Sequence, residues 1–227
     1  MKDFLARTVN ELDWNSGPEQ LIFMGLLLLW LWLIWPSDEF KALLTDKAKQ
    51  TQILLASVAL NALWLLNANV TQGIHVHFLG LVTLMLMYGW RMASVISILP
   101  VLFFTIFVIK SPFDFAIYGL LGINLPLFLC FIVYSQIFKY LPHHLFVYIF
   151  GGAFINAFLS IVFHILLWAA WLWLSTDYDW AFLRDNYLLI IPLLGFPEAL
   201  LNGMAITLLV VYRPQWLYDY SDSTYLK

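Results

Sequence analysis

The sequence predicts an all-α fold, a polytopic membrane helical bundle with about seven transmembrane helices. Of the 227 residues, 63% are hydrophobic and only 11% are charged, whereas a soluble domain carries about a quarter charged residues. The apolar residues come in blocks of about 20, which is the length of a helix that crosses a bilayer. A membrane β-barrel would instead show strict alternation over segments of about ten residues, and the continuous apolar run 26–30 excludes it.

Turn residues and charges separate the predicted spans. The seven expected spans cover about residues 20–35, 51–66, 77–90, 92–109, 119–138, 145–174 and 187–212. Their expected connections are a charged segment at 40–50, a neutral turn at 67–73, Arg91 with its neighbours, a loop at 110–118, a turn at 139–144 and a polar loop at 176–186.

Prolines and lengths refine this outline. Pro18 suits the first turn of the first helix, and Pro36 stops that helix. The span 145–174 is too long for a bilayer of about 30 Å unless it tilts or projects. No repeat or second domain is evident, so we expect a polar lead-in at 1–19, one transmembrane domain at 20–213 and a cytoplasmic tail at 214–227.

The positive charges predict the orientation. Seven spans put the two chain ends on opposite sides, and Lys and Arg favour the cytoplasmic side. One side would collect Lys41, Lys47, Lys49, Arg91, Lys139, Arg213 and Lys227, and the other Lys2, Arg7, Lys110 and Arg184. We therefore expect the N-terminus outside and the C-terminus in the cytoplasm.

Two histidines lie where the third predicted span begins, in the stretch Gly73–Arg91. Imidazole is the commonest side-chain ligand for transition metals, and it suits nickel, copper, cobalt and zinc alike. In an extended turn His75 and His77 would point the same way, whereas in a helix they would diverge. The alternative is that both are solvated interfacial side chains.

Other polar residues in or near the spans need a partner or a function, because a charge in the membrane is costly. Gly195 and Pro197 are expected to loosen the helix around Glu198. Glu198 then either lines a substrate path or hydrogen-bonds neighbouring helices through Asn124 or Asn202. His164 is expected to hydrogen-bond a neighbouring helix more readily than to bind a ligand. Asp114 is either a turn residue or a carboxylate at the outer end of the path.

Missing motifs exclude several enzyme classes. The sequence has no Gly-x-x-x-x-Gly-Lys-Ser/Thr loop, so ATP binding of the P-loop kind is excluded. It also has no His-Glu-x-x-His, Gly-x-Ser-x-Gly or Cys-x-x-Cys-His motif, which argues against a zincin, a serine hydrolase and attached c-type haem. We therefore expect no enzymatic activity, no organic cofactor and no nucleic-acid partner.

Three blocks together resemble a known family. His77-Phe78-Leu79-Gly80 with Tyr88-Gly89-Trp90, the glycine-rich block ending at Asn124, and Phe196 to Leu200 running on to Arg213-Pro214 are similar to blocks of the membrane substrate-binding subunits for cobalt and nickel. Those subunits belong to energy-coupling-factor ABC transporters. The segments 210–216 and 225–227 resemble a bacterial branch of such permeases.

The resemblance implies a function and a ligand set. In that family seven spans with an outward N-terminus hold one metal ion near the outer face. Its ligands are the N-terminal amine, the histidine after the initiator methionine and the histidine of the second block. His77 matches the last ligand, whereas Lys2 stands in place of the second. His75 could supply a replacement imidazole.

Two functions follow as expectations. The first is a substrate-binding subunit in a bacterial inner membrane for uptake of a divalent transition metal, cobalt or nickel by resemblance, with copper or zinc also compatible. It would work with separate ATPase and coupling subunits, bind metal through His77 and His75, and use Asn124, Glu198, His164 or Asp114 as secondary contacts or along the path. The alternative is a non-transport accessory, assembly or metal-delivery subunit of a larger membrane complex such as a respiratory enzyme.

Overall fold

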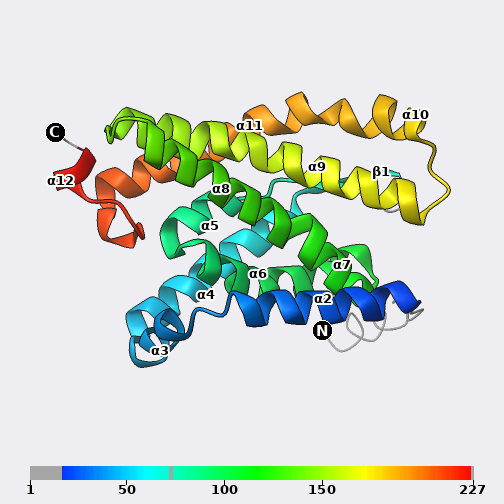
Figure 1. The fold of residues 1–227 in the computed structure, drawn as a ribbon, viewed down its shortest axis with the longest axis horizontal. Coiled ribbons are helices and arrows are strands. Elements are labelled where there is room, and N and C mark those ends of the chain that lie inside the picture. Colours follow the sequence, from blue (N-terminus) through cyan, green and yellow to red (C-terminus); the bar gives the residue numbers. More distant parts are fainter. Residues whose placement is uncertain (1–16, 72–73, 226–227) are drawn as a thin grey trace. The chain divides into compact units, whose positions relative to one another are not determined.

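The computed structural model describes residues 17–71 and 74–225, and these residues are almost entirely helical (Figure 1). Residues 1–16 of the polar lead-in, residues 72–73 and the last two residues lie outside this description. The chain forms two compact units, Met1–His77 with Ser94–Leu120 and Phe78–Ala93 with Leu121–Lys227. The predicted all-α class is confirmed.

The first unit consists of helices around a two-stranded hairpin. Its elements are α2 (Pro18–Leu33), α3 (Ser37–Thr45), α4 (Lys47–Leu65), β1 (Asn67–Thr71), β2 (Ile74–His77), most of α6 (Trp90–Phe104), η1 (Thr105–Ile109), η2 (Pro112–Asp114), α7 (Phe115–Ile117) and the start of η3 (Tyr118–Asn124). Pro18 opens α2, and the Asp46 carboxylate caps α4 by accepting the amides of Ala48 and Lys49.

The second unit consists of long helices that pack side by side. Its elements are α5 (Leu81–Tyr88), the rest of η3, α8 (Leu125–Tyr140), η4 (Val147–Ile155), α9 (Asn156–Ser175), α10 (Trp180–Leu183), η5 (Arg184–Leu188), α11 (Ile190–Tyr212), η6 (Pro214–Trp216) and α12 (Asp222–Tyr225). Helix α9 packs against both α8 and α11 (Figure 1). Small residues of α11 allow close approach, since Gly195 faces the Phe158 ring of α9 and Gly203 faces Phe154 of η4.

Several helices are long and apolar enough to cross a membrane. Within the described residues, four continuous helical segments pass this test, namely Trp90–Ile109, Pro112–Tyr140, Val147–Ser175 and Trp180–Tyr212. Helices α2 and α3, which meet at a 79° bend after Pro36, make a fifth if they count as one broken span. Helix α2 also exposes Leu21, Trp32 and Leu33, as expected for side chains that face lipid. The chain is therefore a multi-pass membrane protein.

The third predicted span differs from the structure. Residues 77–90 do not form one helix, because His77 ends strand β2 and α5 covers only eight residues. Gly80 and Gly89, both with positive φ, flank α5 and limit its length. The neutral turn predicted at 67–73 begins with strand β1, which pairs with β2.

Three predicted connections are partly helical. The segment 40–50 contains most of α3 and the first turn of α4, and helix begins at Pro112 within the predicted loop 110–118. In the predicted loop 176–186, helix begins at Trp180. Proline and short polar side chains near these points suit helix starts, so polarity alone misplaced the boundaries.

Candidate metal site

Strands β1 and β2 place both histidines of the predicted site on one face of the hairpin. The strands are antiparallel, and alternate residues of a strand point to the same face. His75 and His77 accordingly both contact the ring of Phe104, with centroid separations of 6.1 Å and 4.7 Å. The expected common direction of the two rings is therefore present in the first unit.

His77 is enclosed by aromatic side chains. Only 2% of its surface is exposed. The imidazole lies 5.2 Å from the Trp64 ring and 4.7 Å from the Phe104 ring, measured between centroids. Its Nε2 is hydrogen-bonded to the hydroxyl of Tyr118. A metal ion that takes this nitrogen must therefore displace the Tyr118 hydroxyl.

His75 is half-buried and carries an unsatisfied nitrogen. Its Nδ1 is enclosed and has no hydrogen-bond partner among the described residues. Loss of hydration lowers the pKa of His75 below its usual value, because burial disfavours the charged imidazolium. A histidine must be neutral to coordinate a metal, so this lowered pKa favours the form that a metal requires.

Glu198 holds the turn that begins α5 within the second unit. Its Oε1 accepts hydrogen bonds from the amide of Gly80 at 2.7 Å and from Nδ2 of Asn202 at 2.8 Å. Its Oε2 accepts a hydrogen bond from the amide of Leu79 at 2.9 Å. Asn202 in turn accepts bonds from the amide and the hydroxyl of Thr83. These contacts tie α11 to α5 and fix the left-handed conformation of Gly80.

The other predicted residues have hydrogen bonds or burial of their own. His164, on α9, is hydrogen-bonded through Nδ1 to the carbonyl of Gly122 at 2.6 Å, and Asn124 is fully buried; both belong to the second unit. Asp114 belongs to the first unit, where it accepts a 3.3 Å hydrogen bond from Gln20. Among the described residues, no three His, Cys, Asp or Glu side chains group closely enough to hold a metal.

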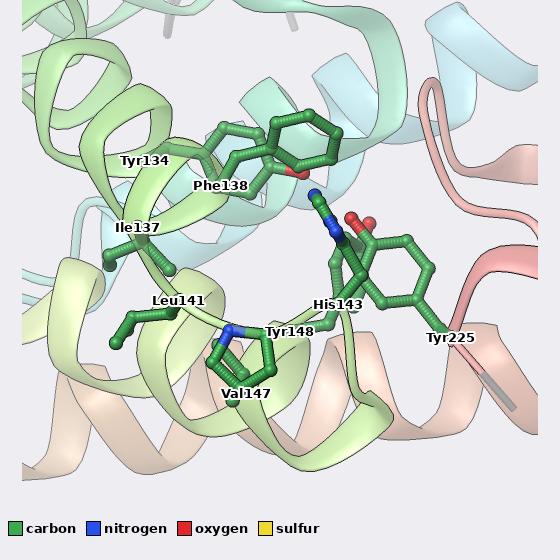
Figure 2. A pocket seen from close by; sticks show the side chains of 9 residues that line it. Tyr134, Ile137, Phe138, Leu141, His143, Val147, Tyr148 and Tyr225 are labelled. Atoms are coloured by element: carbon green, nitrogen blue, oxygen red, sulfur yellow. The ribbon is translucent and has the colours of Figure 1, made fainter. Parts of the chain in front are cut away.

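A small pocket lies elsewhere in the second unit and contains none of the predicted site residues (Figure 2). Aromatic and aliphatic side chains of α8, η4 and α12 line it, together with His143. Its interior volume is about 10 Å³, which is room for about one water molecule. This pocket is therefore too small to hold an organic substrate.

Tyr118 is the contact that sequence reasoning missed. It lies in the glycine-rich block that resembles the cobalt and nickel subunits, where Asn124 is the residue predicted to contribute to the site. A tyrosine at the start of an apolar helix is ordinary, and nothing local links it to a histidine 41 residues earlier. The only available signal was that both residues lie in blocks shared with the same family.

Comparison with known families identifies the chain. Residues 18–216 match the family described as the cobalt uptake substrate-specific transmembrane region. The chain belongs to this family. The match covers both units, including the hairpin with His75 and His77, and it confirms the family resemblance noted in the sequence. The protein is thus a membrane component of the cobalt uptake family, which identifies it as part of a transport system.

A solved structure shares the fold of this cobalt uptake family member. It is described as a truncated transition metal transporter, and it superimposes with a TM-score of 0.65 at 14% sequence identity. The similarity covers 86% of this chain and 95% of the other. No curated protein matches the chain in sequence. At this identity the solved structure supports the helical fold and not a particular metal.

Proposed function

We propose that this protein is the substrate-binding membrane subunit for uptake of a divalent transition-metal ion, with cobalt or nickel as the preferred substrate. The observation that carries the proposal is the pair His75 and His77 on one face of a hairpin, in a chain of the cobalt uptake family. His77 serves as the principal ligand and His75 as the second. The unsatisfied Nδ1 of His75 supports this pairing.

The proposed subunit is one transmembrane domain, residues 20–213, in a bacterial inner membrane. It has seven spans, with the N-terminus outside and the tail 214–227 in the cytoplasm. The distribution of Lys and Arg supports this orientation. The ion would then bind at the outer face, because this orientation puts the turn with His75 and His77 outside.

The proposal gives the remaining polar residues different roles. Glu198 and His164 bond helices together, since their described hydrogen bonds go to backbone groups and to Asn202. Asp114 belongs to the same unit as the histidines and could attract the incoming cation. Asn124 is buried in the glycine-rich segment and would line the inward path.

Metal counting on the purified full chain tests the proposal. Protein stripped of metal in detergent is incubated separately with cobalt, nickel, copper and zinc, and the bound ion is counted after desalting. We expect a stoichiometric ion in the wild type and its loss in His77→Ala. His144→Ala removes an exposed histidine on a loop and should bind as the wild type does. A wild type without any bound ion would contradict the proposal.

Co-purification separates the proposed function from the accessory role. An uptake subunit of this kind has no ATP-binding loop of its own, so it requires a separate ATPase and a coupling membrane subunit. Mild solubilisation of tagged protein from its native membrane should therefore recover an ATPase. Recovery of a respiratory enzyme without an ATPase would favour the assembly role instead.

A further inference from the structure

The strand facing the two histidines also carries two regularly placed polar side chains. In the register of the hairpin, Asn67 pairs with His77 and Asn69 pairs with His75. Directly opposed residues of an antiparallel pair project from the same face, with Cβ atoms about 4.5–5.5 Å apart. One face of the hairpin therefore presents two imidazoles and two carboxamides.

The described contacts of Asn67 orient its carboxamide. Its Nδ2 lies 3.4 Å from the carbonyl oxygen of Trp64 and 3.2 Å from that of Leu65, and donates to both at the end of α4. Because these bonds engage the amide nitrogen, they turn Oδ1 of Asn67 away from the end of α4. A carboxamide oxygen in this position can accept a proton donor or coordinate a cation.

We infer that the carboxamide oxygens of Asn67 and Asn69 complete the donor set formed by His77 and His75. This inference rests on the proposed function, since it concerns the same ion. All four proposed ligands then come from the two strands of one hairpin.

Two observations distinguish this arrangement from ordinary sheet packing. Asparagine is depleted in strands, so sheet formation by itself does not favour Asn67 and Asn69 at alternate positions. On the same face, Nδ1 of His75 is enclosed without a hydrogen-bond partner among the described residues, although a buried polar atom normally has one. A cation shared by the opposed side chains would supply that partner.

The donor set defines the class of substrate. Two imidazole nitrogens favour first-row transition metals over magnesium and calcium, which prefer all-oxygen sites. The absence of thiolate from the set disfavours copper(I) and leaves divalent cobalt, nickel, copper and zinc. All four donors are uncharged, so the ion keeps its full charge and is held less tightly than by carboxylates. Moderate affinity suits an ion that must later be released inward.

Ligand substitutions in β1 test the inference. Cobalt(II) and nickel(II) affinities are measured by titration calorimetry on the full chain in detergent, and the cobalt(II) absorption spectrum reports the donor atoms. We expect Asn69→Ala and Asn67→Ala each to weaken binding by about tenfold or more, as loss of a contact at a metal site does. Asn69→Asp, which adds a charged oxygen, should tighten binding and shift the spectrum.

The matched control lies on the other face of the same strand. Ala68→Ser, opposite Val76, should leave affinity and spectrum unchanged. If the wild type binds no ion, the proposed function fails. If the wild type binds an ion and both alanine variants stay within about twofold of it, the function stands and the inference fails. Weaker binding in Asn69→Ala without tighter binding in Asn69→Asp would also overturn the inference, because it would mark Asn69 as structural.

Discussion

His77 is held in place by a hydrogen bond and by the aromatic rings around it. The Tyr118 hydroxyl bonds to its Nε2, and the Tyr118 ring stacks on Phe104 at a centroid distance of 5.3 Å. Such packing limits the rotation of the imidazole, which reduces the entropy lost when a metal binds. The same hydroxyl also occupies the nitrogen that an ion would use.

Replacing Tyr118 with phenylalanine separates these two effects. The ring and its stacking remain in Tyr118→Phe, but the competing hydrogen bond is lost. A hydrogen bond of this kind contributes about 0.5–1.5 kcal/mol, so we expect metal affinity to rise by about two- to tenfold. Titration calorimetry with cobalt(II) measures this change. Weaker binding would show that the hydroxyl supports the ligand rather than competing with the ion.

Glu198 provides a second prediction at the scale of a residue. Glu198→Ala leaves the buried amides of Leu79 and Gly80 without their acceptor, at a cost of about 2–6 kcal/mol. Glu198→Gln keeps one acceptor oxygen and should cost about half as much by the same reasoning. Thermal unfolding in detergent compares the two variants. Equal stability of the wild type and Glu198→Ala would contradict the bonding role.

At the scale of elements, the second unit depends on close helix packing. A Cβ atom on Gly195 of α11 would lie 2.8 Å from a ring carbon of Phe158 on α9, which is closer than real contacts allow. The side chain of Pro197 lies only two residues further along α11, where it interrupts the helix hydrogen bonds. This part of α11 therefore leaves no space for a larger side chain at its contact with α9.

Gly195→Ala should consequently destabilise the protein. Overpacking of this kind costs about 1–3 kcal/mol, because the Phe158 ring or the helix must shift. Gly25→Ala on α2 is the control, since a Cβ there meets nothing within 4 Å. Thermal unfolding in detergent should show a lower midpoint for Gly195→Ala alone. A similar loss in both variants would point to a general effect of glycine replacement.

At the scale of the whole molecule, the chain passes repeatedly between two compact units. The division falls after His77, Ala93 and Leu120, so neither unit is a continuous stretch of sequence. The histidine hairpin belongs to one unit, and the Glu198 contacts with Leu79 and Gly80 belong to the other. A domain boundary in the usual sense, at an exposed linker, is absent from the described residues.

The proposed orientation can be tested by labelling single cysteines in intact cells. Ser111→Cys, in the outer connection, should react with a membrane-impermeant maleimide, because the lysine and arginine distribution places it outside. His144→Cys, in an inner connection, should react only after the membrane is permeabilised. The native Cys130 is fully buried and serves as the unreactive background. The reverse pattern would invert the topology.

The sequence by itself determined the membrane class, the family and the main helices. Long apolar runs require backbone hydrogen bonds to be satisfied within the segment, and a helix does this locally. Local spacing likewise determined that His75 and His77 face the same way once the segment is extended. These properties depend on neighbours in the chain, so they could be inferred from residues alone.

Only the tertiary structure decided what surrounds those residues. Pairing of β1 with β2 turned the start of the third predicted span into a hairpin. Glu198, 118 residues further along the chain, accepts the amide of Gly80 and so fixes the turn before α5. Tyr118 reached His77 across 41 residues. Hydropathy and motif spacing report what a segment can become, whereas the partners of buried polar groups depend on which distant segments pack together. The histidine pair was visible in the sequence, but its aromatic enclosure and the opposed asparagines required the fold.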